Sequence, residues 1–121
     1  MPVREQRWER GDTTRYHDSE SGQLSRSEDY SPEGRLTCSV DYTYDDRGNN
    51  IERVVRDGTD KLIRRLQFEF DVQDREIIHR EYDSANILQF TRHFDYLDAQ
   101  RRQVHTKYVT GEETVEIENY A

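Results

Sequence analysis

The sequence predicts an all-β protein, an antiparallel up-and-down meander of about eight or nine strands. Three observations predict it. One pattern of alternating apolar residues recurs every 26 residues, which is typical of strands with one buried face. Tyr, Phe, Thr, Val and Ile are spread along the chain, whereas Ala, Lys and Met, which favour helices, are scarce. Turn-forming residues separate the apolar runs every 12–14 residues, as in successive hairpins.

The repeat places the long strands. Leu36 to Tyr44, Leu62 to Phe70 and Leu88 to Tyr96 match at 26-residue intervals. They predict long strands over 35–44, 61–70 and 87–96, shorter return strands over 50–56, 76–82 and 102–108, and weaker flanking strands over 12–18, 23–30 and 113–120. Each unit is therefore a double hairpin. Residues 1–11 show no pattern beyond Trp8, and either they are loose or they cap the first strand.

The turns between these strands are rich in Asp, Asn and Gly, of which Asp45 to Asn49 and Asp57 to Asp60 are examples. Such residues accept a positive φ or form local side-chain hydrogen bonds. The return strands are less regular, because Ile51 and Ile78 fall on opposite sides of the alternation. A bulge in the return strands would reconcile them.

The chain, residues 1–121, is predicted to form a single β-repeat domain whose best repeats span 35–108. Only 31% of its residues are hydrophobic and 36% are charged, so the sheet has one thin apolar face. A single sheet of this kind needs something packed against its apolar face to be stable. Three solutions stay open: it curls or closes into a barrel-like sheet, packs on a copy of itself, or continues into another chain.

The net charge is −8, and both halves of the chain are acidic. A nucleic-acid partner is not expected, because it requires a basic stripe. An acidic body suits a basic protein partner. No apolar signal segment and no 18-residue apolar run are found, so we expect no membrane partner and a cytoplasmic location. The single cysteine, Cys38, lies on the apolar side of its strand and fits a reducing compartment.

The segment from Tyr42 to Ile51, Tyr-Thr-Tyr-Asp-Asp-Arg-Gly-Asn-Asn-Ile, resembles the YD repeat of the Rhs family. Phe68 to Ile77 is a diverged copy, and Tyr82 to Leu88 and Phe94 to Asp98 are partial ones. The resemblance implies a β-repeat fold and a bacterial or phage origin. Members of the family form spiralling β-sheet shells, often around toxins. This chain has a longer unit and is too short for a shell, so the resemblance implies an accessory or binding protein.

No catalytic motif and no phosphate-binding loop is found, so the sequence predicts neither an enzyme nor a cofactor. No metal site is predicted either. His79 and His105 hold equivalent repeat positions, which lie two strands apart, about 9.5 Å in a meander. That is too far for two ligands of one zinc ion. His17 and His93 add no ligand-like spacing, and the Asp residues of the turns follow no calcium-binding pattern.

The predicted binding residues are Arg64, Arg92, Tyr44, Phe70 and Tyr96. Both arginines fall on the apolar side of the alternation, where a cation needs a partner, a polar cavity or an aliphatic route to the sheet edge. The three aromatic residues belong to a band along the same face, and aromatic and arginine side chains are enriched in binding hot spots.

Two functions follow as hypotheses. The first is a non-catalytic protein–protein interaction module, acting through a partner protein or by self-association across the aromatic face. Its most concrete form is an inhibitor or immunity-type protein with an acidic surface for a basic partner. The alternative is a small up-and-down β-barrel that carries a small-molecule ligand, with Arg64 and Arg92 facing an anionic group.

Overall fold

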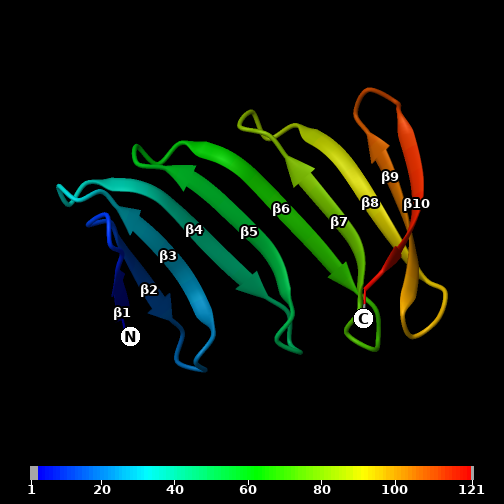
Figure 1. Ribbon diagram of the computed structural model, residues 1–121, viewed down its shortest axis with the longest axis horizontal. Helices are drawn as coiled ribbons and strands as arrows, with labels where there is room; N and C mark the ends of the chain where they lie inside the picture. Colours follow the sequence, from blue (N-terminus) through cyan, green and yellow to red (C-terminus); the bar gives the residue numbers. More distant parts are fainter. Residues whose placement is uncertain (1–2, 121) are drawn as a thin grey trace.

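The computed structural model describes residues 3–120, which form ten strands in one antiparallel sheet. Each strand is hydrogen-bonded to the next in chain order (Figure 1). The strands are Val3–Arg7 (β1), Thr13–Asp18 (β2), Leu24–Tyr30 (β3), Leu36–Tyr44 (β4), Asn50–Asp57 (β5), Leu62–Phe70 (β6), Glu76–Tyr82 (β7), Leu88–Tyr96 (β8), Arg101–Tyr108 (β9) and Glu113–Asn119 (β10). The predicted all-β up-and-down meander is confirmed. The described residues contain no helix that is long and apolar enough to cross a membrane.

The 26-residue repeat is visible in the structure. The long strands β4, β6 and β8 are nine residues each and start at Leu36, Leu62 and Leu88. Strand β1 is the one that the pattern does not reveal, and it brings the number of strands to ten. It pairs with β2 from Val3 opposite His17 to Arg7 opposite Thr13. An edge strand forms main-chain bonds without burying a face, so it needs no apolar alternation. Residues 1, 2 and 121 lie outside the described residues.

Eight of the nine turns in residues 3–120 share one geometry. The N–H of the first residue donates to the carbonyl of the fifth, and the N–H of the fourth donates to the carbonyl of the first. The fourth residue has a positive φ and is Gly11, Gly22, Gly34, Gly48, Asp60, Asp74, Asn86 or Gly111. These residue types tolerate that conformation best. The turn from Leu97 to Arg101 is the exception.

Aspartate at the first turn position ties the loop together. Asp45 Oδ1 accepts hydrogen bonds from the N–H groups of Arg47 and Asn49, each at 2.9 Å. Asp57, Asp71 and Asp83 repeat this arrangement. Hydrogen bonds from backbone N–H groups are the main cause that lowers the pKa of Asp45, Asp71 and Asp98, whereas for Asp57 the Thr59 hydroxyl is the main cause of its lowered pKa.

Acid should therefore weaken the fold through its turns. A carboxylate whose pKa is lower in the folded than in the unfolded chain stabilises the fold above its unfolded pKa, about 4. That stability is lost as the pH falls from about 4 through the lower, folded pKa. We expect the unfolding free energy, measured with urea, to drop steeply below about pH 4.

The matched control for this prediction is the fourfold variant Asp45→Asn, Asp57→Asn, Asp71→Asn and Asp98→Asn. The Asn side chain still accepts the turn hydrogen bonds but does not titrate. Its stability should fall less between pH 5 and pH 3 than that of the wild type. An equally steep fall in the variant would contradict the assignment to the turns.

The bulges predicted in the return strands are present. In the β4–β5 ladder Tyr44 is opposite Asn50 and Thr43 is opposite Glu52, so Ile51 is the extra residue. In the β6–β7 ladder the same shift falls at Ile77. The bulges follow the turns directly and reset the alternation, because the extra residue in one strand changes which parity faces each side.

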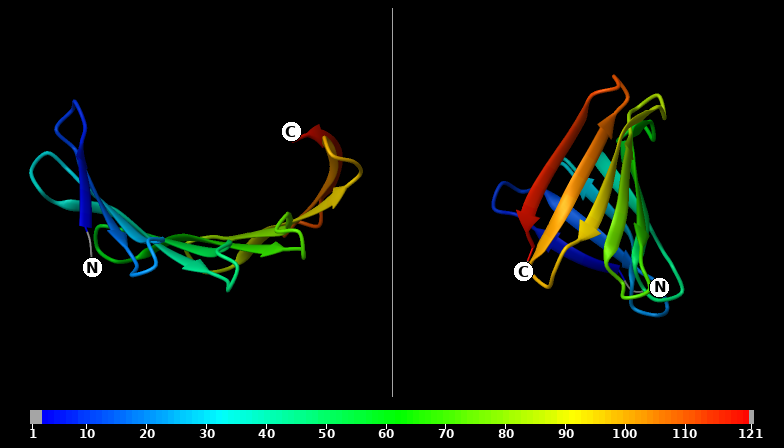
Figure 2. Two further views of the ribbon diagram at one scale, coloured as in Figure 1. Left: turned by 90° about the horizontal axis from the view of Figure 1, so that it is seen from below. Right: turned by 90° about the vertical axis from the view of Figure 1, so that its right-hand side faces the viewer.

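The sheet curls but does not close. Strands β1 and β10 are at opposite ends of the strand order and do not pair with each other (Figure 2). Of the two forms predicted, the curled one is therefore correct and the closed barrel is not formed. The closed barrel is also what the ligand-carrier alternative needs. Sheet twist and bulges bend the meander, but ten strands stop before the ends meet.

Alternation divides the sheet into two faces. The aromatic face carries Val40, Tyr42, Tyr44, Arg53, Val55, Leu66, Phe68, Phe70, His79, Phe90, Phe94, Tyr96, Val104 and Tyr108, as the cross-strand pairs show. The opposite, charged face carries mostly Arg, Glu, Asp and His. Among the hydrophobic side chains of residues 3–120, only Phe94 and Val104 are buried, each 7% exposed. The predicted thin apolar face is confirmed, and among residues 3–120 no second layer covers it.

Candidate functional site

A continuous row of stacked side chains crosses the aromatic face from β4 to β9. The guanidinium of Arg53 lies 5.9 Å from the ring centre of Tyr42 and 5.3 Å from that of Phe68. Phe68 stacks on His79 at 4.9 Å, His79 meets Phe90 edge-on at 5.5 Å, and Phe90 lies 6.1 Å from Tyr108. We call this set, Tyr42, Arg53, Phe68, His79, Phe90 and Tyr108, the aromatic row.

Strand register builds the row, one residue from each of six consecutive strands. Tyr42 is directly opposite Arg53, Phe68 is directly opposite His79 and Phe90 is directly opposite Tyr108. The two remaining neighbours, Arg53 with Phe68 and His79 with Phe90, are diagonal pairs. Side chains at these spacings are close enough to stack. None of the six is buried, and Arg53 is exposed. The row is a partly exposed line of aromatic and cationic groups, the kinds of side chain that are enriched in binding hot spots.

His79 is the polar centre of the row. Its Nε2 atom is buried and has no hydrogen-bond partner within the described chain. Burial lowers the pKa of His79, and the nearby charge of Arg92 acts in the same direction. The imidazole is therefore neutral at pH 7 and stacks as an aromatic ring between Phe68 and Phe90.

Protonation of His79 should destabilise the sheet. Because the pKa is lower in the folded chain, the unfolded chain binds more protons below its own pKa, about 6.5. Stability is then complete above about pH 6.5 and decreases as the pH falls toward the folded pKa. The variant His79→Phe, which keeps the stack and removes the unpaired nitrogen, should lose this decrease between about pH 7 and pH 5.

Urea unfolding at several pH values measures the effect, and His93→Phe is the matched control because His93 is exposed on the charged face. That control should keep the decrease in stability. The assignment to His79 is wrong if the two variants show the same pH dependence.

A groove lies on the aromatic face over β7 to β10, at one of the two ends where the sheet curls (Figure 2). The groove has a volume of about 420 Å³ and is lined by polar and charged groups that include Glu76, Arg92, Arg102 and Thr106. Burial raises the pKa of Glu76, while the charges of Arg102, Arg53 and Arg92 act against that rise. Arg102 pairs with Glu118 of β10 and lies 4.2 Å over the ring of Phe94. The groove is thus polar, with Glu76, Glu116 and Glu118 facing Arg92 and Arg102.

The two predicted arginines lie on the aromatic face, as the pattern indicated, but they have different surroundings. Arg64 lies 3.7 Å from Glu81 on the neighbouring strand, and about half of its side chain is exposed. Arg92 donates to Thr106 Oγ1 at 3.2 Å and lies 4.6 Å from the ring centre of Phe90. Arg64 therefore has a carboxylate partner, whereas Arg92 borders both the aromatic row and the groove.

Tyr44, Phe70 and Tyr96 occupy equivalent positions at the ends of β4, β6 and β8. The hydroxyl of Tyr44 donates to the carbonyl of Leu24 at 2.6 Å, and that of Tyr96 donates to Glu76 in the same way. Both tyrosines have a structural role between strands, because each hydroxyl holds the first residue of the preceding return strand. Phe70 lacks the hydroxyl. None of the three belongs to the aromatic row.

Sequence reasoning missed Arg53 and His79 as members of one site. They lie on return strands, where bulges change the parity that faces the apolar side. The signal that was present is the equivalence of Arg53, His79 and His105 in the repeat. That signal breaks at β9, where the ladder to β8 has no register shift.

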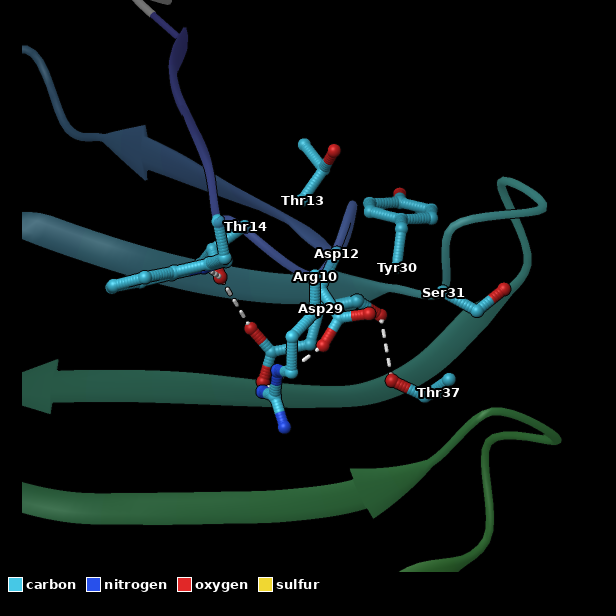
Figure 3. A pocket seen from close by; sticks show the side chains of 9 residues that line it. Arg10, Asp12, Thr13, Thr14, Asp29, Tyr30, Ser31 and Thr37 are labelled. Carbon is cyan, nitrogen blue, oxygen red and sulfur yellow. Dashed lines mark hydrogen bonds and ion pairs between the residues drawn. The ribbon is translucent and has the colours of Figure 1, made fainter.

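A second hollow lies at the other end of the sheet, between β1 and β4 (Figure 3). Trp8 Nε1 donates to Thr14 Oγ1 at 3.0 Å, and that hydroxyl donates to Asp29 at 2.7 Å. The Trp8 side chain is 45% exposed. This chain of bonds anchors the first turn to β2 and β3, so Trp8 caps the N-terminal part of the sheet.

The charged face is held by ion pairs between neighbouring strands. Asp41 joins Arg26 at 3.0 Å and Arg56 at 2.9 Å, linking β3, β4 and β5. His93 and His105 are directly opposite on β8 and β9, with ring centres 6.5 Å apart. The sequence did not predict this contact, because the two residues are not equivalent in the repeat. In residues 3–120 no three His, Cys, Asp or Glu side chains gather as metal ligands.

Cys38 is partly buried on the aromatic face between two carboxylates. It is opposite Asp29 on β3 and Asp57 on β5. Burial raises the pKa of the Cys38 thiol, and Asp29 and Asp57 raise it further. A thiol of this kind is a poor nucleophile at pH 7.

Comparison with known protein families and with curated proteins gave no match for this sequence. Three solved structures are similar over most of the chain. A mutant of S. aureus TarM with fondaparinux, α-GlcNAc-glycerol and UDP has 16% identity, 97% coverage of this chain and 21% of that chain, and a TM-score of 0.42. The TcdB2–TccC3–Cdc42 structure is 15% identical, with a TM-score of 0.37, and the match covers 91% of this chain and 8% of that chain. The GtfA/B complex bound to UDP and GlcNAc is 7% identical, with a TM-score of 0.33, and the match covers 95% of this chain and 23% of that chain.

This chain spans less than a quarter of the length of each of those three chains. At these TM-scores the likeness carries no argument about function.

Proposed function

We propose that this chain is a non-catalytic protein–protein interaction module that binds a partner protein through its aromatic face. The observation that carries the proposal is the aromatic row, six stacked aromatic and cationic side chains that no second layer of the described chain covers. Stacking restrains the rings of the row before binding, which reduces the side-chain entropy lost when a partner covers them. Aromatic rings and arginine supply most of the energy in protein interfaces.

We propose further that the partner is basic, as an inhibitor or immunity-type role requires. The net charge of −8 supports this. The acidic turns support it as well, because hydrogen bonds lower the pKa values of Asp45, Asp57, Asp71 and Asp98 and keep these groups charged. Charges of this kind at the rim raise the association rate with a basic partner. The thiol of Cys38 supports a reducing, cytoplasmic setting.

We also propose that the repeat is a diverged YD repeat. Each part of the motif has a physical role in the hairpin from Tyr44 to Ile51. Tyr44 bonds the preceding return strand, Asp45 holds the turn, Gly48 takes the positive φ and Ile51 is the bulge residue. The hairpin 26 residues further along keeps the aspartate as Asp71 and the aliphatic bulge residue as Ile77, while Asp74 takes the positive φ in place of glycine.

The experiment is a pull-down from the native host, with mass spectrometry, that compares the wild type with the double variant Arg53→Ala and Phe68→Ala. Truncation of one interface hot spot typically costs about 2 kcal/mol, or roughly thirtyfold in Kd. A protein recovered by the wild type should be lost with the double variant. Its affinity for the purified wild type should weaken as the salt concentration rises.

The matched control is Glu69→Ala with Arg80→Ala, which removes an ion pair of 2.6 Å on the charged face. This variant should recover the same partner as the wild type. Recovery of one and the same protein by all three forms would place the contact elsewhere. If the wild type recovers nothing, the proposal of a partner protein is wrong.

A further inference from the structure

The two edge strands have main-chain groups that face outward. Hydrogen-bonded and non-hydrogen-bonded pairs alternate along an antiparallel ladder. The N–H of Trp8 donates to the carbonyl of Asp12, so every second residue before Trp8 also faces β2. The residues between them, Val3, Glu5 and Arg7, have N–H and C=O groups that point away from β2. By the same reasoning, the bond from Tyr120 N to Gln100 O leaves Glu113, Val115 and Ile117 as the outward residues of β10.

Strand β10 lacks three of the features that protect a sheet edge, and the charges that it carries are all glutamates. Natural edges carry charged side chains, above all lysine, or proline or a bulge. The β10 sequence Glu-Thr-Val-Glu-Ile-Glu-Asn has neither residue, and its ladder to β9 has no register shift. Val115 and Ile117 are 60% and 55% exposed on the charged face. An open, regular edge with exposed β-branched residues is a site for strand addition.

The charges of the two edges are complementary. Strand β10 and the residue before it contain four glutamates and no basic residue: Glu112, Glu113, Glu116 and Glu118. Strand β1 contains Arg4 and Arg7 with a single acid, Glu5. Pairing of β10 with β10 of a second copy would place glutamates opposite or beside glutamates, which is unfavourable. Pairing of β10 with β1 brings opposite charges together.

We propose that β10 of one copy pairs antiparallel with β1 of a second copy of this chain. The register that we infer sets Arg4 opposite Glu116 and Gln6 opposite Thr114 on the aromatic face. On the charged face it sets Val3 opposite Ile117, Glu5 opposite Val115 and Arg7 opposite Glu113. Two ion pairs and one apolar pair result, and each outward-facing residue of β1 meets an outward-facing residue of β10.

The direction of the chain fits this pairing as well. Strands alternate in direction along the meander, so the position beyond β10 calls for a strand that runs like β1, β3 and the other odd-numbered strands. The β1 strand of a second copy fits the position next to β10, and the aromatic faces of the two copies then lie on the same side of the joined sheet. Within one copy the two edges lie at opposite ends of the curled sheet (Figure 2). A head-to-tail contact of this type closes into a ring or extends as a filament, as its rotation dictates.

The test measures the mass of the purified full chain by light scattering and sedimentation across the micromolar range. Wild type should associate. The variant Val115→Pro removes an outward N–H that no bond to β9 uses, so it should stay folded and remain monomeric. Val115→Thr keeps the N–H and should associate as the wild type does. Circular dichroism confirms that each variant is folded.

Charge exchange tests the register. Arg4→Glu with Arg7→Glu should weaken association at least tenfold, and so should Glu113→Arg with Glu116→Arg. The fourfold variant that carries all these changes should restore it, which loss of folding would not do. A monomeric wild type would overturn the proposal. Association that Val115→Pro leaves intact but Arg53→Ala with Phe68→Ala abolishes would overturn it too, because the contact would then lie on the aromatic face.

Discussion

Replacement of Phe94 with alanine should destabilise the protein by about 3 kcal/mol, since buried Phe→Ala changes cost roughly 3–5 kcal/mol. Phe94 is one of the two buried hydrophobic side chains in residues 3–120, opposite Val104 on β9. Its ring also supports the guanidinium of Arg102, 4.2 Å away. We place the cost at the low end of the range because a single sheet can relax into the space more easily than a closed core.

Urea unfolding at pH 7 measures this loss as a lower midpoint with an unchanged slope. Because small domains have only about 5–15 kcal/mol of stability, a loss of this size is a large part of the whole. The matched control is Val72→Ala, at a turn position that is 82% exposed, and it should change stability by less than about 0.5 kcal/mol. A loss below about 1 kcal/mol in Phe94→Ala would show that the buried contact of Phe94 with Val104 contributes little to the stability of the sheet.

Replacement of Gly58 with alanine should cost about 1–3 kcal/mol, the usual cost of overpacking. Gly58 lies in the turn between β5 and β6 and does not have a positive φ. The cost is steric, because an added Cβ would overlap the carbonyl oxygen of Leu36 and lie 3.1 Å from its carbonyl carbon. Both atoms belong to the backbone, so the turn or the start of β4 has to move.

The repeat provides the matched control for Gly58. Ser84 holds the equivalent position, 26 residues further along, and already has a Cβ. Ser84→Ala should leave the thermal midpoint almost unchanged, whereas Gly58→Ala should lower it by roughly 5–15 °C. Equal midpoints for the two variants would show that the turn shifts freely away from Leu36.

Local chemistry made most of the fold predictable. Alternation with a 26-residue period gave the long strands β4, β6 and β8, and the Asp and Gly residues gave the turns between them. Strand β1 escaped prediction because its residues, Val3 to Arg7, are exposed and do not alternate. Its pairing with β2 rests on main-chain bonds and on the ion pairs Arg4–Asp18 and Arg15–Glu5, none of which an apolar alternation reveals.

The candidate site was predictable only in part. Phe68 and Phe90 belong to the long-strand pattern, and the sequence placed them on the aromatic face. Their neighbours in the row, Arg53 and His79, depend on the bulges at Ile51 and Ile77, and a bulge cannot be positioned from alternation alone. The hydroxyls of the predicted residues Tyr44 and Tyr96 bond to the backbone of the preceding strand, a contact that depends on strand register and that alternation does not predict.

The sequence alone determined the class of fold, the direction of neighbouring strands and the presence of one thin apolar face, because all three follow from residue period and turn chemistry. Only the tertiary structure decided whether the sheet closes and what stacks on that face. Closure depends on twist and bulges summed over ten strands, and stacking depends on register between strands. Both are properties of pairs of strands, so no single stretch of sequence contains them.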